Sequence, residues 1–353
     1  MISELYNESI GLLKQLIATP SFSREEDATA LLLETFLRQK NIETHRVKNN
    51  IWCRNRYFDE SRPSLLLNSH HDTVKPNLQY TRDPFSPHTV DGKLYGLGSN
   101  DAGGSLVALI ATFLHFYDKQ DLKYNIMLAI SAEEEISGRE GIELLLPHLG
   151  TIDFAIVGEP TLTNLAIAEK GLLVIDCTAH GRAGHAARNE GENAVYKALK
   201  DIEWLNSFRF PKVSPLLGPV KMSVTVINTE NKAHNVVPAS CSFVADVRVT
   251  DAYTLEEVLE TIRRHISSDL KPRSLRMRSS SIAIDHPIVL AGKALGKTTY
   301  GSPTTSDQAL IPFPSLKCGP GDSARSHTAD EFIYLHEVEA GIDTYIKLLN
   351  DIL

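Results

Sequence analysis

Residues Leu65–Asp72, with the sequence LLLNSHHD, decide how the rest of the chain is interpreted. The apolar run follows Pro63 and ends in polar residues, a pattern typical of a short buried strand in a parallel sheet. His70 and Asp72 then lie at the carboxyl end of that strand, where ligand and metal sites of open α/β sheets collect. Residues two apart on an extended chain point to the same side, so Asp72 can accept one ring N–H of His70 and leave the other nitrogen for a metal. A solvated, histidine-rich loop is the alternative.

Length and composition are those of an ordinary globular protein. The 353 residues suffice for two domains or one large one, and 42% hydrophobic with 23% charged residues are usual values. A formal charge of −8 argues against nucleic acid and anionic membranes as partners. The sequence shows no signal peptide, no apolar run long enough to span a membrane and no C-x-x-C pair among its four cysteines. We therefore expect a cytoplasmic protein.

The first half of the chain alternates helical and strand patterns. Apolar spacing predicts a helix between Leu5 and Ile17, and Ser23–Glu26 fits a capping box that opens a second helix. A helix predicted over Leu106–Phe113 follows a glycine-rich stretch and places Asp101 at its N-terminus, where a simple N-cap is the competing interpretation. The strands expected here are residues 44–47, 51–54, 65–70, 125–130 and 154–157.

The pattern changes near Leu165 and returns to α/β after Pro287. The intervening segment predicts a four-stranded antiparallel sheet with two helices, inserted into the first domain. We therefore expect an α/β catalytic domain of residues 1–164 and 282–353 and an inserted α+β domain of residues 165–281. The strands expected in the insert are residues 165–180, 221–228, 240–250 and 273–280, and its helices are 191–205 and 255–266. Later elements are helices at 288–295 and 336–352 and a strand at 314–318.

Five potential metal ligands follow strands or loop ends of the α/β domain: His70, Asp101, Glu135, Glu159 and His327. Glu135 ends the run Glu133-Glu134-Glu135, whose carboxylates repel one another unless a cation sits among them; a solvated acidic loop is the alternative. Two histidines and three carboxylates suit zinc first, with cobalt or manganese as substitutes. Five ligands fit two metals about 3.5–4 Å apart, with Asp101 in its glycine-bounded setting as the natural bridge.

Glu134 lies beside a candidate ligand and among like charges. It is therefore well placed as a general base that takes a proton from the attacking water and passes it to the leaving amine.

These motifs together make the chain resemble the M20 family of co-catalytic metallopeptidases and deacylases, which includes acetylornithine deacetylase, succinyl-diaminopimelate desuccinylase and carboxypeptidase G-type enzymes. The resemblance covers nearly the whole chain. Five motifs of the family match in order: H-x-D at His70–Asp72, the bridging-aspartate segment at Gly98–Asp101, (D/E)-E-E at Glu133–Glu135, G-E-P-T at Gly158–Thr161, and the late histidine at His327.

The resemblance implies a zinc-exopeptidase-like domain with specific roles for these residues. One zinc ion would be held by His70, Asp101 and Glu159, and the second by Asp101, Glu135 and His327. Glu134 would be the base, Asp72 would orient His70, and the peptide bond between Asp101 and Ala102 would be cis.

The inserted segment resembles the dimerisation domain of that family, which implies a homodimer. Gly181–Ala186 matches a G-x-x-x-H-A motif whose histidine, here His185, acts from the partner subunit as a donor to the oxyanion; a surface histidine is the alternative. Asn235 and Arg248 match substrate-holding motifs, and the Arg248 guanidinium suits the α-carboxylate. Thr305 is a weaker substrate contact.

Two positions depart from the family pattern. Lys170 lies in the segment Glu169–Leu172, where succinyl-diaminopimelate desuccinylases carry Arg-Arg-Gly-Ser. The difference weakens the assignment to that enzyme. Lys170 can still meet a succinyl carboxylate as a point charge. Asn100 replaces a small residue or threonine, and the sequence offers no reason for it.

We therefore predict a two-zinc amidohydrolase that removes the acyl group from an N-acyl-L-amino acid. The substrate predicted first is N-acetylornithine or an N-acylcitrulline, in arginine biosynthesis. Succinyl-diaminopimelate desuccinylase and a di- or tripeptidase are the enzymatic alternatives. A catalytically inactive metal-binding scaffold protein is the alternative from another class, and the intact Glu134 argues against it.

Overall fold

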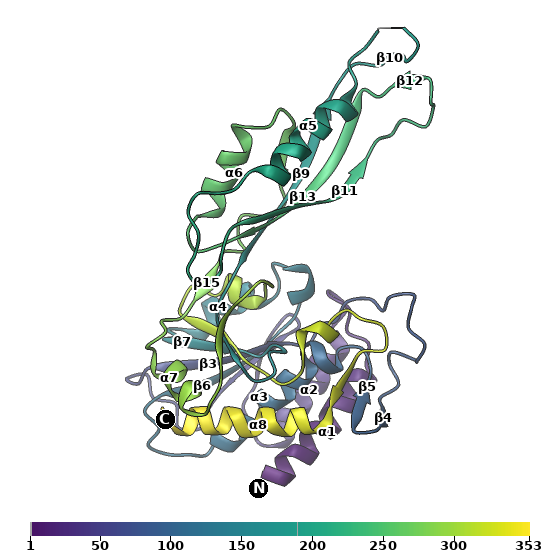
Figure 1. Ribbon diagram of the computed structural model, residues 1–353. Coiled ribbons are helices and arrows are strands. Elements are labelled where there is room, and N and C mark those ends of the chain that lie inside the picture. Colours follow the sequence, from purple (N-terminus) through teal and green to yellow (C-terminus); the bar gives the residue numbers. More distant parts are fainter. Residues whose placement is uncertain (1, 189) are drawn as a thin grey trace. The chain divides into compact units, whose positions relative to one another are not determined.

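The computed structural model describes residues 2–188 and 190–353 and divides into two compact units (Figure 1). Unit 1 comprises Met1–Ala168, Ser281–Tyr300 and Ser306–Leu353, and unit 2 comprises Glu169–Ser280 and Gly301–Thr305. Both units combine helices with strands, so the predicted α/β class is confirmed.

Unit 1 is built on a sheet that has nine strands within the described residues. The central strands β6 (Asn125–Ser131), β3 (Ser64–His70), β7 (Phe154–Val157) and β17 (Ser315–Lys317) are parallel to one another. The remaining strands are β1 (His45–Val47) and β2 (Asn50–Arg54) beside β6, and β8 (Leu165–Glu169), β15 (Ser280–Ser281) and β16 (Thr299–Ser302) beyond β17. Parallel strands end at the same edge, so the residues that follow β3, β6 and β7 come together in space.

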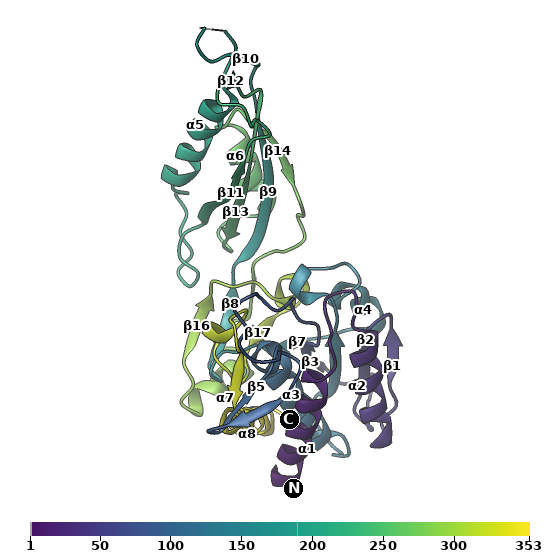
Figure 2. The ribbon, with the colours of Figure 1, turned by 90° about the vertical axis from the view of Figure 1, so that its right-hand side faces the viewer.

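Helices cover both faces of this sheet. Leu65 and Leu67 of β3 are buried in one core with helices α1 (Ile2–Ile17), α2 (Asp27–Gln39), α3 (Gly104–Phe116), α7 (Pro287–Ala294) and α8 (Leu335–Asn350). Leu66 points the other way, into a second core with α4 (Ile142–Leu149). Burial on both faces explains why the strand is a continuous apolar run rather than an alternating one. Figure 2 shows α1, α3 and α8 gathered on one side of the strands.

A small sheet in unit 1 joins distant parts of the chain. It consists of β4 (His88–Val90), β5 (Lys93–Tyr95) and β18 (Phe332–Tyr334), with β5 in the middle. The pairing brings the segment before Asp101 next to the segment after His327.

In the part of unit 2 that the structure describes, four antiparallel strands form one sheet, as predicted. Their order is β11 (Lys221–Asn228), β13 (Ser240–Val249), β9 (Gly171–His180) and β14 (Asp269–Pro272). Alternate residues of β9 pack beneath α5 (Ala194–Ser207) and α6 (Leu255–Arg263), which gives the strand its period-two pattern. A short pair, β10 (Gly184–His185) with β12 (Val236–Val237), adjoins the start of β13.

Two sequence predictions about the insert are wrong in detail. The sequence pattern assigned Leu165–Ala168 to the insert. These residues instead lie in β8 of the large sheet, where all of them are buried, and they belong to unit 1. A strand was expected at residues 273–280, whereas the fourth strand is Asp269–Pro272. After Pro272 the chain still runs beside β9, with the Arg273 N–H donating to the Val174 carbonyl and the Leu172 N–H to the Met277 carbonyl, but these isolated bonds do not form a regular strand.

Over residues 2–188 and 190–353, no helix has both the length and the apolar character needed to cross a lipid bilayer.

Candidate functional site

The predicted metal ligands all lie in unit 1, beyond the carboxyl ends of strands or in loops beside them. His70 ends β3, Glu159 follows β7, and Glu135 lies in the 3-10 turn η2 (Glu134–Ile136) after β6. Asp101 lies in the turn η1 (Ser99–Gly103) before α3, and His327 follows the short 3-10 turn η4 (Ser323–Arg325).

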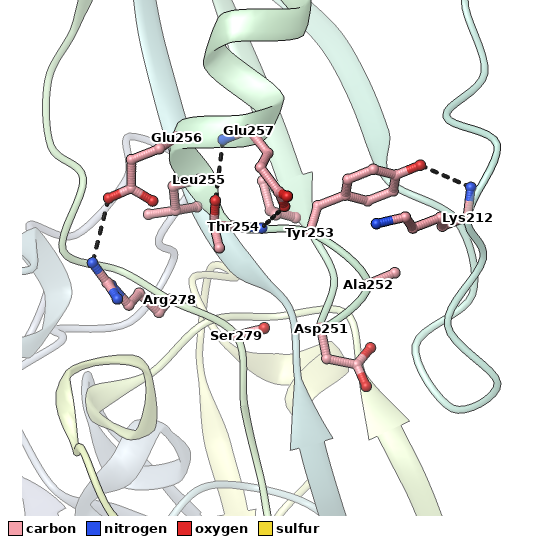
Figure 3. A pocket seen from close by; sticks show the side chains of 11 residues that line it. Lys212, Asp251, Ala252, Tyr253, Thr254, Leu255, Glu256, Glu257, Arg278 and Ser279 are labelled. Carbon is pink, nitrogen blue, oxygen red and sulfur yellow. Dashed lines mark hydrogen bonds and ion pairs between the residues drawn. The ribbon is translucent and has the colours of Figure 1, made fainter.

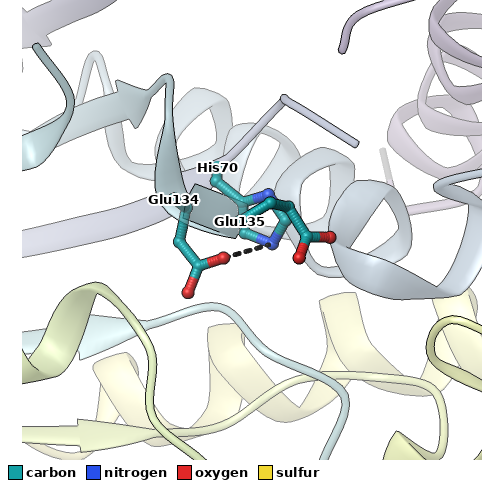
Figure 4. Close-up of side chains that lie close together, drawn as sticks. All are labelled: His70, Glu134 and Glu135. Atoms are coloured by element: carbon teal, nitrogen blue, oxygen red, sulfur yellow. Dashed lines mark ion pairs between the residues drawn. The ribbon is translucent and has the colours of Figure 1, made fainter. Parts of the chain in front are cut away.

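These residues form three groups whose candidate ligand atoms lie within 4.8 Å of one another. The groups are His70 with Asp101 and Glu159, Asp101 with Glu135 and His327, and His70 with Glu134 and Glu135 (Figure 4). The first two are the sets that the family resemblance implies for two metals, and Asp101 is common to both.

The environment of His70 fits a metal ion. The ring is 1% exposed, and its Nε2 atom is buried without a hydrogen-bond partner. Around Nε2 lie carboxylate oxygens of Asp101 at 3.4 Å, Glu159 at 3.7 Å and Glu134 at 3.9 Å. These distances are long for hydrogen bonds, whereas a cation between the groups would coordinate the nitrogen and the oxygens together.

Asp72 does more than the sequence predicted. His70 Nδ1 faces it, 3.0 Å from its backbone oxygen and 3.4 Å from its carboxylate, as expected for an orienting residue. The carboxylate also accepts the backbone N–H groups of Glu134 at 3.0 Å and Glu135 at 3.2 Å. Asp72 therefore fixes both the first histidine and the acidic turn.

Ser23 supplies a third bond to this carboxylate, its hydroxyl donating to Asp72 at 2.7 Å. The capping box predicted over Ser23–Glu26 is therefore wrong. Helix α2 begins at Asp27 with Glu26 at its N-cap and no side-chain cap, so Ser23 lies before the helix.

Asp101 lies in a turn rather than at the predicted helix N-terminus. Helix α3 begins at Gly104, and the peptide bond between Asp101 and Ala102 is cis, as the resemblance implied. Gly98, which precedes the turn, has a φ of 74°, and a Cβ atom there would lie 2.6 Å from the Thr73 side chain. The glycine before the turn is thus required by conformation and by space.

His327 completes the second group from a loop. Its Nε2 atom lies 3.0 Å from Glu135 and 3.6 Å from Asp101, and its side chain is 55% exposed. The backbone φ of 59° is in the left-handed region, which costs energy in a non-glycine residue and is found at functional sites.

Burial and crowding shift the pKa values of this cluster. Burial together with neighbouring charges raises the pKa of Glu134 above its usual range and that of Glu159 to about 8. The hydrogen bond to Glu135 raises the pKa of His327 to about 9, and for His70 the surrounding carboxylates outweigh burial and raise the pKa. Without a cation, the cluster therefore holds protons that ordinary carboxylates and imidazoles would have released at neutral pH.

Metal binding is consequently expected to release protons. His70, Glu159 and His327 must each lose a proton to coordinate, so apparent metal affinity should rise with pH between about 6 and 9, with about two or more protons released per chain at pH 7. Calorimetric titration with Zn²⁺ in buffers of different ionisation enthalpy measures this number. An affinity independent of pH would contradict the ligand assignment.

Sequence reasoning missed three buried polar residues of unit 1. Asp307 is 3% exposed, accepts the Ser131 hydroxyl at 2.5 Å, has a pKa raised by burial to about 7, and contributes to the raised pKa of Glu134. Glu331 and Asn100 contact the loops that carry Asp101 and His327. Asp307 lies two residues after Thr305, which was predicted from the sequence to be a substrate contact.

The predicted substrate residues lie in unit 2, in two separate groups. The Arg248 guanidinium bonds both carboxylate oxygens of Asp246 and donates to the Thr305 hydroxyl at 3.1 Å, which in turn donates to the Lys170 carbonyl at 3.0 Å. His185 and Asn235 belong to the β10–β12 pair, where the Ala186 N–H donates to the Asn235 carbonyl.

These two groups lie at opposite ends of β13. Arg248 is near the end of the strand, whereas His185 and Asn235 adjoin its start, where Figure 1 draws β10 and β12. Eight residues of strand separate the two ends by about 26 Å.

A hollow of about 460 Å³ lies elsewhere in unit 2, at the start of α6 (Figure 3). Several of its polar groups are paired with one another: Thr254 and Glu257 form a capping box, and Arg278 contacts Glu256 at 3.3 Å. None of the residues lining it belongs to the candidate metal groups.

The family model described as "Peptidase family M20/M25/M40" matches residues 66–351. The chain belongs to this family. It is 29% identical to a succinyl-diaminopimelate desuccinylase of Cereibacter sphaeroides, over 98% of both chains. The resemblance inferred from the motifs is therefore confirmed, and the protein is an M20 metal-dependent amidohydrolase.

Solved structures share the fold. An M20 metallo-carboxypeptidase of Sulfolobus solfataricus superimposes with a TM-score of 0.77 at 17% identity, covering 98% of this chain and 99% of that one. A dinuclear metal-binding peptidase of the M20 family from Bacillus subtilis gives 0.72 at 16% identity, covering 98% of each chain.

Proposed function

We propose that this protein is a two-metal hydrolase, with zinc the first metal to test, that removes the acyl group from an N-acylated amino acid. The observation that carries the proposal is the sharing of Asp101 between two three-residue ligand groups, with Glu134 beside them. The dinuclear peptidase of the same fold supports two metals rather than one.

The residues of the site suit amide hydrolysis. Two bound cations would activate water and polarise the amide carbonyl. Glu134 takes the proton of the attacking water and delivers it to the amine nitrogen as the carbon–nitrogen bond breaks. Burial raises the pKa of Glu134 above its usual range, and a carboxylate with a raised pKa is a stronger base than an ordinary glutamate.

Arg248, Lys170 and Lys221 support an anionic substrate. Lys221 lies directly opposite Arg248 on adjacent strands, and both cations lower the pKa of Lys170, after burial. Of these three cations, Arg248 is paired with a carboxylate, that of Asp246. Like charges that face each other on adjacent strands repel, and a ligand with carboxylates would relieve this repulsion. Arg248 and Thr305 would take the α-carboxylate.

His185 and Asn235 are proposed to act on the substrate of a second subunit. A small N-acyl amino acid cannot span the roughly 26 Å between them and Arg248. If both groups contact one substrate, one of them comes from another copy of the chain. The exposed edge strand β11, with Val226 and Ile227 each more than half exposed, and the exposed Tyr196 of α5 offer apolar surface for a homodimer.

The similar proteins change which substrate we propose first. N-acetylornithine was the first sequence-based choice, but the similar desuccinylases favour N-succinyl-diaminopimelate, the alternative. The additional cations Lys170 and Lys221 agree with an acyl group that carries its own carboxylate. The panel of substrates to be tested therefore contains N-succinyl-diaminopimelate, N-acetylornithine and N-acylcitrulline. It also contains dipeptides, because a metallo-carboxypeptidase has the same fold.

The test is a set of initial hydrolysis rates of the Zn²⁺-loaded protein on this panel. A preference of about 100-fold or more, equivalent to about 2.7 kcal/mol, for a succinylated amino acid is expected. Preference for an acetylated amino acid would return the assignment to the first choice. Preference for a dipeptide would contradict the deacylase proposal while leaving the metal site intact.

Lys170→Met and Lys221→Met are expected to raise KM for succinylated substrates about 10-fold and to leave KM for acetylated ones within about 2-fold. Losing one exposed or half-buried charge contact costs about 1 kcal/mol or slightly more. Lys200→Met, on the exposed surface of α5, is a control for loss of positive charge. An equal effect on both substrate classes would contradict a role in acyl recognition.

A further inference from the structure

Two loops of unit 1 carry Asp101 and His327, and two buried side chains join these loops. The first loop is the turn Gly98–Asp101, and the second is residues 322–331, which contains His327. Asn100 is 0% exposed and Glu331 is 2% exposed, and each reaches from one loop to the other. Neither residue belongs to the candidate ligand groups.

Glu331 holds the turn that presents Asp101. One carboxylate oxygen accepts the N–H of Gly98 at 3.0 Å, and the other accepts the N–H groups of Asn100 at 2.8 Å and Asp101 at 2.9 Å. Burial raises the pKa of Glu331 to about 8, and three backbone N–H groups nevertheless point at its two oxygens. Three hydrogen bonds from one turn to a single buried side chain fix the backbone of that turn.

Asn100 holds the start of the second loop. Its side-chain amide donates to the Asp322 carbonyl at 3.0 Å and accepts the Asp322 N–H at 3.1 Å, as a neighbouring strand would. Asp322 then caps the turn η4 by accepting the Ala324 N–H at 2.9 Å. The preceding Gly321 leaves room for this pairing, since a Cβ atom there would lie 2.5 Å from the Asn100 oxygen.

The loop that carries His327 is therefore fixed at both ends to the turn that carries Asp101. His327 stands between the two fixed points, with a half-exposed side chain. Other contacts also hold this loop, since Asn77 donates to the His327 carbonyl at 3.3 Å and Asp330 accepts the N–H groups of Thr81 and Arg82. Asn100 and Glu331 are the two side chains described above that tie the loop to the turn carrying Asp101. By contrast, His70 is held by Asp72 at the end of a buried strand.

We infer that Asn100 and Glu331 are positioning residues that hold His327 opposite Asp101 and so set the affinity of the metal position formed by Asp101, Glu135 and His327. The position formed by His70, Asp101 and Glu159 shares Asp101 and should depend on them less, because His70 and Glu159 are placed by strands β3 and β7. This inference rests on the proposed function, in which both positions are occupied. It also gives Asn100, which departs from the family pattern, a specific task.

The test is a titration of metal-free protein with Zn²⁺ against a competing chelator, without substrate. Asn100→Ser keeps a polar but shorter side chain, and Glu331→Gln keeps the shape but replaces one acceptor oxygen with a donor. Each is expected to weaken the second metal equivalent about 10- to 100-fold, as loss of a residue supporting a ligand typically does, and the first by less than about 3-fold. Repeating the titration with Co²⁺ should show an altered visible spectrum for the second equivalent alone.

Asn125→Ala is the matched control. Asn125 is also a buried asparagine that bonds backbone carbonyls, those of Asp59 at 2.7 Å and Arg62 at 3.1 Å, but it lies at the opposite end of β6 from the acidic turn. It should lower the thermal stability of the metal-free protein and leave both metal affinities unchanged.

Each result is decisive. A selective loss of the second metal in either variant supports the inference. Equal loss of both metals, or loss of stability with unchanged affinities as in Asn125→Ala, overturns it and leaves the proposed function standing. A wild-type chain that takes up a single metal contradicts the proposed function itself, and this inference with it. If Asn100→Ser does not fold, Glu331→Gln alone decides.

Discussion

Glu134→Gln is expected to lower kcat by about 10²–10⁴-fold, the usual contribution of general acid–base catalysis, while two metals remain bound. Glutamine has the same shape but cannot take the proton of water or return it to the amine. The acidic turn should keep its place, because Asp72 holds it through backbone N–H groups rather than through the Glu134 side chain. Metal content by mass spectrometry and single-turnover hydrolysis measure the two quantities separately.

Glu133→Gln is the control for this variant. Glu133 belongs to the same acidic run, but its carboxylate accepts the N–H of Glu140 at 3.3 Å and it is not in the candidate metal groups. It should keep kcat within a few fold. If Glu134→Gln retains turnover, the general-base role is wrong. If it loses its metals, Glu134 is needed for metal binding, as its place in the group with His70 and Glu135 would allow.

His185→Ala is expected to lower kcat by about 10²–10³-fold, the usual effect of losing an oxyanion donor. If His185 acts on the substrate of the partner subunit, a mixture with Glu134→Gln should recover activity. In a mixed dimer, the subunit with an intact Glu134 receives an intact His185 from its partner. Random exchange of equal amounts then gives about a quarter of the wild-type rate, because half of the dimers are mixed and each has one complete site.

The control for this experiment is His180→Ala. His180 is another exposed histidine of unit 2, paired with Asp269 at 2.9 Å, and its removal should leave hydrolysis unchanged. Mixtures that stay inactive after subunit exchange, verified by mass spectrometry, would show that His185 acts within its own subunit or not at all.

The five residues predicted as metal ligands lie close together in the structure, and the sequence could indicate this because most of them follow a feature with a strong local signal. His70 ends an apolar strand, and Glu135 and Glu159 follow two others within a few residues. Parallel strands bring such residues to one edge of the sheet without further information. The family resemblance added the pairing into two sets and the cis peptide at Asp101. The antiparallel sheet of the insert was predictable from the alternation in residues 171–180.

What the sequence did not reveal are interactions between residues far apart in the chain. Asn100 and Asp322 are separated by more than 200 positions, as are Glu331 and Gly98, and no local pattern marks either pair. Ser23 had a convincing local role as a helix cap, yet its hydroxyl bonds Asp72. Tertiary hydrogen bonds thus decided which of several plausible local roles each polar residue took.

The measurement that tests the central claim most directly is the rate of amide hydrolysis during a titration of metal-free protein with Zn²⁺, on the best substrate of the panel. The account predicts no hydrolysis without metal and a rate that reaches its maximum at two equivalents per chain. Hydrolysis that persists in the metal-free protein would contradict the account. No hydrolysis of any panel substrate at any metal content would contradict it as well.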